Sequence, residues 1–157
     1  MNRTGLWLIY TILVKVYQLR LKCMAIKYHP EQGAIVICDF TGFVKPEMIK
    51  RRPVVVVSPR FRDRPGLCTI VPCSTTKPSK MQPYHFELNT DPPLPDPYSM
   101  SPCWVKCDMI YAVSLSRLSF PAFRKDLWGE RMYDLRTVSA EDMISIRHCI
   151  MASIGGI

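Results

Sequence analysis

The stretch RRPVVVVSP, residues 51–59, decides the fold of this chain. Its four consecutive valines are β-branched and apolar, which predicts a strand over 53–58 that other elements cover on both faces. Pro53 and Pro59 mark the points where regular strand pairing stops, because proline donates no backbone hydrogen bond. The chain therefore builds its core around a buried sheet.

A second buried strand follows, and both strands bring polar residues to their ends. The run LCTIV before Pro72 predicts a strand over 67–72, so Ser74 and Thr75 emerge where that strand ends. Arg52 lies at the mouth of the first strand. A cation near two hydroxyl groups predicts a phosphate-binding site.

The rest of the chain supplies further strands and two long connections. Strands are predicted over 34–40, 84–88 and 104–114, in a sheet that we expect to be mainly antiparallel. The segments 41–50 and 91–97 are predicted to be irregular, the second because four prolines fix its backbone and remove donors. Either connection can fold over a ligand.

The C-terminal segment predicts one helix. Ser139 is a helix cap, the first turn is acidic, and Gly155 stops the helix. Apolar residues at helical spacing form the face expected to pack on the sheet: Met143, Ile146, Ile150 and Ile154. The prediction is a single α+β domain without internal repeats.

The composition indicates one domain with a moderate preference for a polyanionic partner. The 157 residues are 48% hydrophobic and carry a net charge of +8. Residues 1–23 hold four basic side chains and no acid, so residues 24–157 carry only +4, with 17 basic and 13 acidic side chains. Such a charge favours nucleic acid or another anionic partner without making the chain polybasic.

The N-terminal segment is expected to lie outside the domain. Residues 6–14 are apolar or nearly so, but a bilayer span takes about 20 residues, and the small-residue pattern of a signal-peptide cleavage site is absent. We interpret 1–23 as an extension that need not belong to the physiological protein, with Met24 as the start of the domain 24–157. A short peripheral helix is the alternative, and no membrane contact is expected.

The cysteines predict neither a metal site nor a cofactor. Seven are present, at positions 23, 38, 68, 73, 103, 107 and 149, and no Cys-x-x-Cys pair occurs among them. Cys103 and Cys107 have no second pair of ligands nearby to complete a tetrahedral site. Cys38, Cys68 and Cys107 fall in apolar runs and are predicted to be buried thiols of a reduced, cytoplasmic protein.

Four short motifs and a closing helix stand in a fixed order between Met24 and Ile154. The motifs are GAIVICDF at 33–40, Arg-Pro at 52–53, PCST at 72–75 and WVKCD at 104–108. In this order the chain resembles the MazF/PemK toxins of bacterial type II toxin–antitoxin systems, which are small dimeric endoribonucleases. The resemblance rests on several motifs at compatible spacing, since each alone is weak.

The resemblance implies a fold, an activity and partners. The fold is a small SH3-like, mainly antiparallel β-barrel of the CcdB/PemK type with a C-terminal helix. The activity is metal-independent cleavage of single-stranded RNA, in practice mRNA, that leaves a 2′,3′-cyclic phosphate and a 5′-hydroxyl. The partners are a second copy of the chain and a cognate antitoxin, with DNA bound only through the toxin–antitoxin complex.

The resemblance also assigns catalytic roles to residues that chemistry alone leaves open. Arg52 is the cation that holds the scissile phosphate, although a salt-bridged surface arginine is the ordinary alternative. Ser74 and Thr75 match the Ser/Thr pair that orients the phosphate, whereas a Ser-Thr-Thr loop is more often a turn or a cap.

Lys106 and Asp108 are the remaining catalytic candidates. They are two apart on a predicted strand, so they are expected on the same face, as a catalytic pair or as a structural ion pair. The family tripeptide Arg-Cys-Asp is Lys106-Cys107-Asp108 here. Lysine keeps the charge of arginine but loses its bidentate geometry. Arg52 is therefore the alternative candidate for the catalytic role of the family's arginine.

Further residues are predicted to contact RNA. They are Arg51, Thr76, Lys77, His85, Arg60 and Arg62. His29 is a weaker candidate, and His148 is expected on the surface of the terminal helix. The cations and aromatic rings of residues 123–133 are typical of single-stranded RNA binding and equally of a protein interface.

A non-catalytic role is the main alternative to RNA cleavage. The same barrel occurs in the gyrase-poisoning CcdB relatives, and a degenerate toxin would bind only nucleic acid or an antitoxin. Arg52 with Ser74 and Asp108 favours the nuclease, whereas Lys106 in place of arginine leaves the alternative open.

Overall fold

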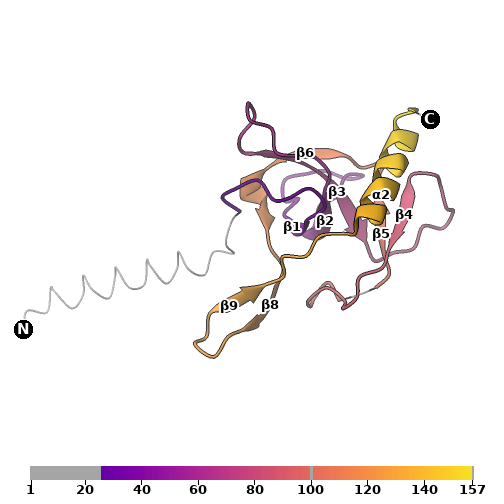
Figure 1. Cartoon of the computed structure of the whole chain (residues 1–157). Coiled ribbons are helices and arrows are strands. Elements are labelled where there is room, and N and C mark those ends of the chain that lie inside the picture. The colour runs from indigo at the N-terminus through magenta and orange to yellow at the C-terminus, as the bar shows by residue number, and fades with distance from the viewer. Residues whose placement is uncertain (1–25, 100, 157) are drawn as a thin grey trace, which may run out of the picture.

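The computed structural model describes residues 26–99 and 101–156, so the predictions for residues 1–23 lie outside the described residues. A bent antiparallel sheet carries one long helix on one face, and a hairpin projects from the body (Figure 1). The elements in chain order are β1 Ile35–Cys38, β2 Arg52–Val56, β3 Leu67–Ser74, β4 His85–Leu88, β5 Cys103–Lys106, β6 Tyr111–Ser114, the 3₁₀ helix η1 Leu115–Arg117, β7 Leu118–Ser119, β8 Ala122–Lys125, β9 Arg131–Tyr133 and α2 Ala140–Ser153. Within the described ranges, no helix is long and apolar enough to cross a membrane.

The central strand of the sheet is β3. The strand order is β4-β5-β3-β2-β1-β7, and β6 pairs with β3 as well. One edge of β3 pairs with β2, while the other pairs with β6 along Leu67–Ile70 and with β5 along Cys73–Ser74. Every strand pair is antiparallel, so the predicted α+β fold with a mainly antiparallel sheet is confirmed.

The valines of β2 are continuous in sequence because both faces of the strand are buried. Val54 and Val56 belong to a core cluster with Val36, Phe40 and Ile70 on one face of the sheet. On the other face Val55 belongs to a second cluster, together with Val71, Val105, Met143 and Ile146. The predicted two-sided burial is confirmed, and α2 covers the second face.

The helix begins at the predicted cap. Ser139 Oγ accepts a hydrogen bond from the Asp142 amide at 3.0 Å, which satisfies one of the first N–H groups of α2. Met143 and Ile146 are buried as expected. The prediction that Ile154 packs on the sheet is wrong, because it caps the helix after its last turn and is 64% exposed. Gly155 follows with a φ of 75°, a conformation that glycine adopts readily.

The prediction of one long strand over 104–114 is wrong, because the segment contains two strands. β5 ends at Lys106, and a turn follows in which the Met109 amide donates to the Lys106 carbonyl at 3.1 Å. β6 begins at Tyr111 and pairs with the other half of the β3 edge. The buried Cys107 kept the apolar pattern continuous through the turn, which hid the break in the sequence.

The cysteines in the described ranges are free thiols, and burial of Cys38, Cys68 and Cys107 is confirmed. Burial raises the pKa of Cys38 to about 12, although the Arg117 charge opposes the shift. Burial likewise raises the pKa of Cys68 to about 11. Both thiols are therefore protonated at neutral pH, and protonated thiols are poor nucleophiles.

These two thiols are expected to resist alkylation until the chain unfolds. At pH 8 the native protein should label at Cys38 and Cys68 at least about 100-fold more slowly than the unfolded chain, whose thiols have pKa values near 8.5. Peptide mapping by mass spectrometry after iodoacetamide treatment, with and without guanidinium chloride, measures the ratio. Equal labelling of Cys38 in both states would contradict its burial.

Candidate functional site

Four polar or aromatic side chains share one row across the sheet, on the face away from α2. Ser74 of β3 lies opposite Trp104 of β5, which lies opposite Glu87 of β4. On the other edge of β3, Val54 lies opposite Pro72, so extending this register by two residues sets Arg52 opposite Ser74. Directly opposed residues in an antiparallel pair point to the same face. The extended register therefore sets Arg52 and Ser74 on the same face of the sheet.

Arg52 is a half-buried cation at the start of β2, opposite the buried Cys38 of β1. Its guanidinium makes no hydrogen bond or ion pair with any other residue that the structure describes. A salt-bridged surface arginine, the ordinary alternative, is thus not seen within those ranges. An unengaged guanidinium at this position has its full set of donors available for an anion.

Ser74 has both a structural role and a free donor. Its Oγ accepts a hydrogen bond from the Thr76 amide at 3.1 Å, so the expected turn after β3 is present. The hydroxyl hydrogen is not used by that contact and can donate to a phosphate oxygen. Thr75, Thr76 and Lys77 are exposed in the same turn. Lys77 Nζ lies 5.6 Å from the centroid of the Trp104 ring, a cation–π contact.

Lys106 and His85 form the neighbouring row. They lie directly opposite each other on β5 and β4, and both are half-buried. His85 Nδ1 accepts from the Gln82 amide at 3.3 Å, so the neutral ring carries its proton on Nε2. Because Trp104 and Lys106 are two apart on β5, the Lys106 ammonium and the His85 ring lie on the same face as Ser74.

Asp108 does not lie on strand β5 with Lys106. It lies exposed in the turn after β5, so the expectation that it points from the same strand face as Lys106 is wrong. No ion pair joins Lys106 to Asp108, which removes the structural salt bridge as their explanation. The turn itself is fixed, since the Cys107 amide donates to the Tyr84 carbonyl at 3.1 Å. The backbone therefore holds Asp108 in the turn directly after β5, two residues beyond Lys106.

The connection 41–50 is anchored beside this face. Arg117 donates to the Asp39 and Thr41 carbonyls at 3.0 and 2.9 Å, and its guanidinium lies 5.1 Å from the Phe43 ring centroid. Hydrogen bonds from Thr41 lower the pKa of Asp39, with smaller contributions from the charges of Arg51 and Arg117. Arg51 itself donates to Ser119 Oγ at 3.3 Å. The entry to this loop is thus held in place.

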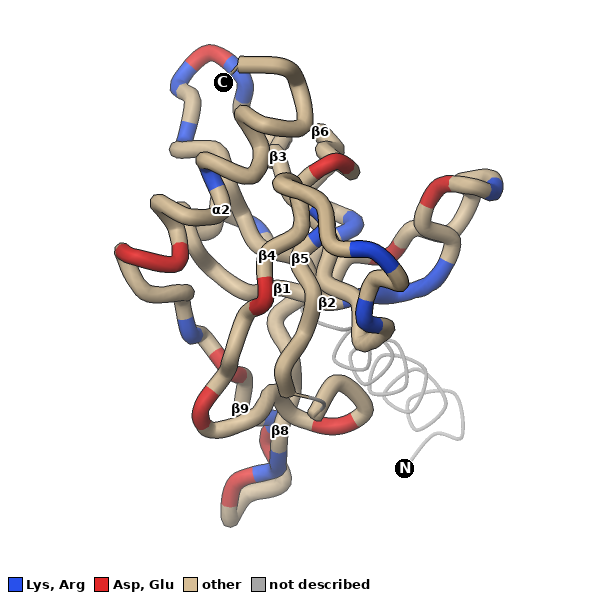
Figure 2. Tube along the Cα trace, turned by 90° about the vertical axis from the view of Figure 1, so that its right-hand side faces the viewer, with Lys and Arg blue, Asp and Glu red and all other residues tan. Residues whose placement is uncertain are grey.

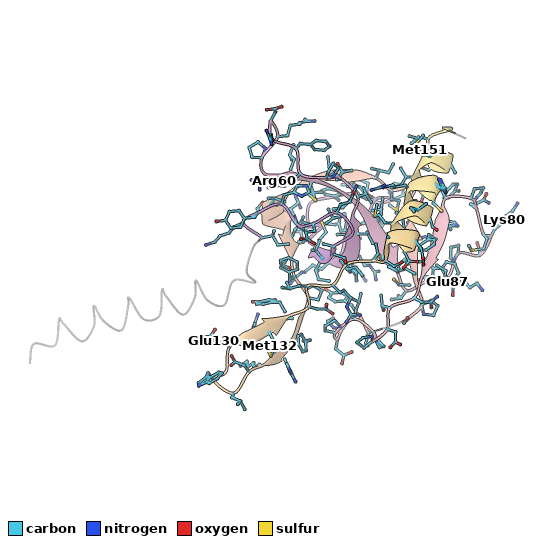
Figure 3. All side chains as sticks on the ribbon, in the orientation of Figure 1. Arg60, Lys80, Glu87, Glu130, Met132 and Met151 are labelled. Carbon is cyan, nitrogen blue, oxygen red and sulfur yellow. The ribbon has the colours of Figure 1, made fainter. Side chains whose placement is uncertain are left out.

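Several predicted contacts lie away from the site. Arg60 and Arg62 are exposed in the β2–β3 connection, at the other end of β3 and roughly 20 Å along the strand from Ser74. Figure 3 shows Arg60 and Lys80 on opposite sides of the molecule. His29 contacts Ser58 Oγ at 3.3 Å at that same distant end, and His148 is exposed on α2.

Comparison with known proteins decides the family. Residues 31–154, most of the chain, match the family described as PemK-like, MazF-like toxin of type II toxin–antitoxin system. The chain belongs to this toxin family.

Curated relatives and solved structures agree with that assignment. The endoribonuclease toxin MazF of Escherichia coli K12 is 34% identical over 67 residues, which cover 42% of this chain and 59% of the toxin. An uncharacterized protein of Haemophilus influenzae is 31% identical over 108 residues, 60% of this chain and 73% of that protein. The chain therefore spans less than two thirds of the E. coli toxin's length.

The fold is that of solved toxins of this family. MazF of Deinococcus radiodurans superposes with a TM-score of 0.56 at 21% identity, covering 82% of this chain and 98% of that one. An endoribonuclease from Mycobacterial species, solved in complex with its cognate antitoxin, superposes with a TM-score of 0.54 at 20% identity. The superposition covers 80% of this chain and 95% of that one. At these identities the similarity establishes the MazF-like fold.

Two neighbours of the site were not predicted from the sequence as functional residues. Trp104 appeared only as part of a motif, although its ring lies between Ser74 and Glu87 in the row. Glu87, labelled in Figure 3, is exposed on the β4 strand at the edge of the sheet. The strand register was the missing information, because it alone sets Trp104 opposite Ser74 and Glu87 opposite Trp104.

The described residues offer no ready metal site. Within 26–99 and 101–156, no group of three or more His, Cys, Asp or Glu side chains is arranged to hold a metal ion. The residues predicted from the sequence as site candidates are cations, hydroxyl groups and one turn carboxylate.

Proposed function

We propose that this member of the toxin family is an endoribonuclease that cuts single-stranded RNA, chiefly mRNA, without a metal ion. The observation that carries the proposal is Arg52, whose guanidinium has no partner among the described residues and whose backbone lies opposite Ser74 when the β2–β3 register is extended by two residues. Two such donors suit two oxygens of one phosphate group. The products are a 2′,3′-cyclic phosphate and a 5′-hydroxyl end, and the expected location is the cytoplasm.

The cleavage step requires one proton to leave the 2′-hydroxyl and another to reach the 5′-oxygen. In the proposed mechanism the Asp108 carboxylate accepts the first proton as the 2′-oxygen bonds to phosphorus, and the Lys106 ammonium donates the second as the P–O5′ bond breaks. Arg52, with Ser74 and Thr75, stabilises the extra negative charge on the phosphate oxygens in the transition state. Arg51, Thr76, Lys77 and His85 hold the flanking RNA.

The direct test is incubation of the purified protein with a mixed-sequence RNA in EDTA. The proposal predicts fragments with 2′,3′-cyclic phosphate ends, detected by mass spectrometry, at a rate unaffected by the chelator. RNA binding without cleavage would instead identify a non-catalytic module on the same barrel. Loss of cleavage in EDTA with recovery on adding magnesium would overturn metal independence.

The proton-transfer roles proposed for Asp108 and Lys106 give a second prediction. Asp108→Asn should slow cleavage by about 100-fold or more, because proton transfer by a positioned group contributes 10²–10⁴-fold, while binding of uncleavable RNA stays the same. Lys106→Arg should keep or raise the rate, since it restores the family residue. Single-turnover rates and RNA affinities of both variants, beside their melting temperatures, are the measurements. Rate losses that track losses of thermal stability would contradict the assignment.

The proposed partners are a second copy of the chain and a cognate antitoxin, with DNA contacted only through their complex. A basic surface with aromatic rings accepts an acidic amphipathic segment through the same groups that hold RNA. Sedimentation velocity at micromolar concentration tests the dimer, and a stable monomer would remove it. An antitoxin encoded beside this chain should inhibit cleavage when mixed in equal amounts.

A further inference from the structure

The β8–β9 hairpin is an arm that the proposed site does not use. Its two strands pair only with each other, and all four residues of β8 are exposed. In Figures 1 and 2 the hairpin projects away from the body. The arm leaves the sheet beside Ile35, at the opposite end of β1 from Cys38 and Arg52. Its side chains therefore serve neither the core nor the Arg52 site of the same copy.

The arm is held in shape at both ends. At the tip, Asp126 Oδ1 accepts from the Trp128 and Glu130 amides at 2.9 and 2.8 Å, and Gly129 has a φ of 80° that suits glycine. At the base, Arg136 forms an ion pair with Asp134 at 2.7 Å. The Asp134 amide donates to the Pro121 carbonyl at 2.8 Å. A pre-formed loop loses little entropy on binding a ligand.

The charges of the arm are arranged at a cost to its own stability. Lys125 and Arg131 lie directly opposite each other across the two strands, and both are exposed. Like charges in this position repel and destabilise a strand pair. Two acids, Asp126 and Glu130, also lie in the turn and keep their negative charge, and the Asp126 carboxylate is turned to the backbone amides of the tip. An opposed cation pair on an isolated hairpin is suited to an anionic ligand that relieves the repulsion.

Aromatic and apolar rings accompany these cations. Trp128 is 84% exposed at the tip, beside Leu127 at 96%. Phe123 is half-exposed at a bulge in β8, with the Arg124 guanidinium 5.3 Å from its ring centroid. Exposed large side chains of this kind mark binding surfaces. Cations alternating with stacking rings are the features that hold single-stranded nucleic acid, where charge follows the backbone and rings stack on bases.

We propose that the β8–β9 hairpin is a second docking element for single-stranded RNA, which binds a part of the strand distant from the Arg52 site. Lys125 and Arg131 contact phosphates, and Trp128 and Phe123 stack on bases. The proposal rests on RNA as the substrate of the proposed function but not on its cleavage chemistry. Long RNAs would therefore bind more tightly than short ones that reach the Arg52 site alone.

The test is binding of uncleavable RNA, because it is independent of catalysis. Fluorescence anisotropy with 2′-O-methyl oligonucleotides of about 6 and about 20 nucleotides compares an RNA that fits one site with an RNA that reaches both. Trp128→Ala should weaken binding of the long RNA by about 5- to 140-fold, the range for loss of one stacked base. The combined change Lys125→Gln with Arg131→Gln should lower the slope of log affinity against log salt by about 1.4. Binding of the short RNA should change less than about twofold in each variant.

Matched changes elsewhere separate the arm from general effects. Ile144→Ala and Arg147→Gln remove an exposed apolar residue and an exposed charge from α2, and neither should affect binding of the long RNA. Unchanged affinity of the Trp128 and Lys125/Arg131 variants for long RNA would overturn the proposal. So would an acidic peptide that binds the arm more tightly than RNA does, because the arm would then be a protein interface. Failure of the wild-type protein to cleave ordinary RNA would refute the nuclease and leave this test intact.

Discussion

Replacing Arg52 by alanine is expected to lower the rate of RNA cleavage by about 30- to 1,000-fold, because a phosphate clamp contributes roughly 2 to 4 kcal/mol to transition-state stabilisation. The fold should survive, since the side chain is only half-buried and has no partner among the described residues. The measurement is the initial rate on a fluorogenic RNA in EDTA, with circular dichroism and a melting curve for the same preparation.

Two further variants make this result interpretable. Arg52→Lys keeps the charge but not the guanidinium fork that binds two oxygens. Its rate of RNA cleavage should therefore fall between those of the wild-type protein and of Arg52→Ala. Arg147→Ala removes a cation from α2, away from the site, and should leave the rate unchanged. A folded Arg52→Ala protein that cleaves at the wild-type rate would refute the assignment.

Replacing Phe40 by alanine is expected to have the largest effect on stability, about 3 to 5 kcal/mol of the free energy of unfolding. The Phe40 ring is fully buried, and its centroid lies 5.5 Å from that of Phe43 and 5.3 Å from that of Tyr111. Removing it leaves a cavity at the entry to the 41–50 connection. Urea unfolding monitored by tryptophan fluorescence measures the loss.

The exposed Phe61 provides the control for Phe40. Its ring is 50% exposed in the β2–β3 connection, so Phe61→Ala should change the free energy of unfolding by no more than about 0.5 kcal/mol. Similar losses in the two variants would show that burial does not set the contribution of Phe40. Loss of RNA affinity in Phe40→Ala protein that is still folded would indicate that the 41–50 connection contributes to binding.

The fold was predictable wherever burial left a periodic pattern in the sequence. The valines of β2 and the capped helix α2 follow from apolar spacing and from Ser139, and both are confirmed. The break at Lys106 was not predictable, because the buried Cys107 continues the apolar run through a turn. The β8–β9 hairpin was missed since its strands bury almost nothing and therefore carry no alternation.

The candidate site was predictable as a set of residues but not as an arrangement. Arg52 and Ser74 emerge from recognisable strand ends, so the sequence alone suggested that they meet. The positions of Trp104 and Glu87 in the row depend on the register between β3, β5 and β4, a long-range property that no local pattern encodes. For the same reason Arg60 and Arg62 were predicted beside a site that lies at the other end of β3.

The position of β3 determines which part of the site stays ordered when the molecule opens. Its edges are occupied by three strands, so its amide hydrogens should exchange with solvent deuterium only when the whole domain unfolds. Ser74 is the last residue of β3, whereas Thr75, Thr76 and Lys77 follow it in an exposed turn. One of the proposed phosphate ligands is therefore expected in the slowest-exchanging segment of the described chain, and its immediate neighbours in a segment that exchanges through local fluctuations.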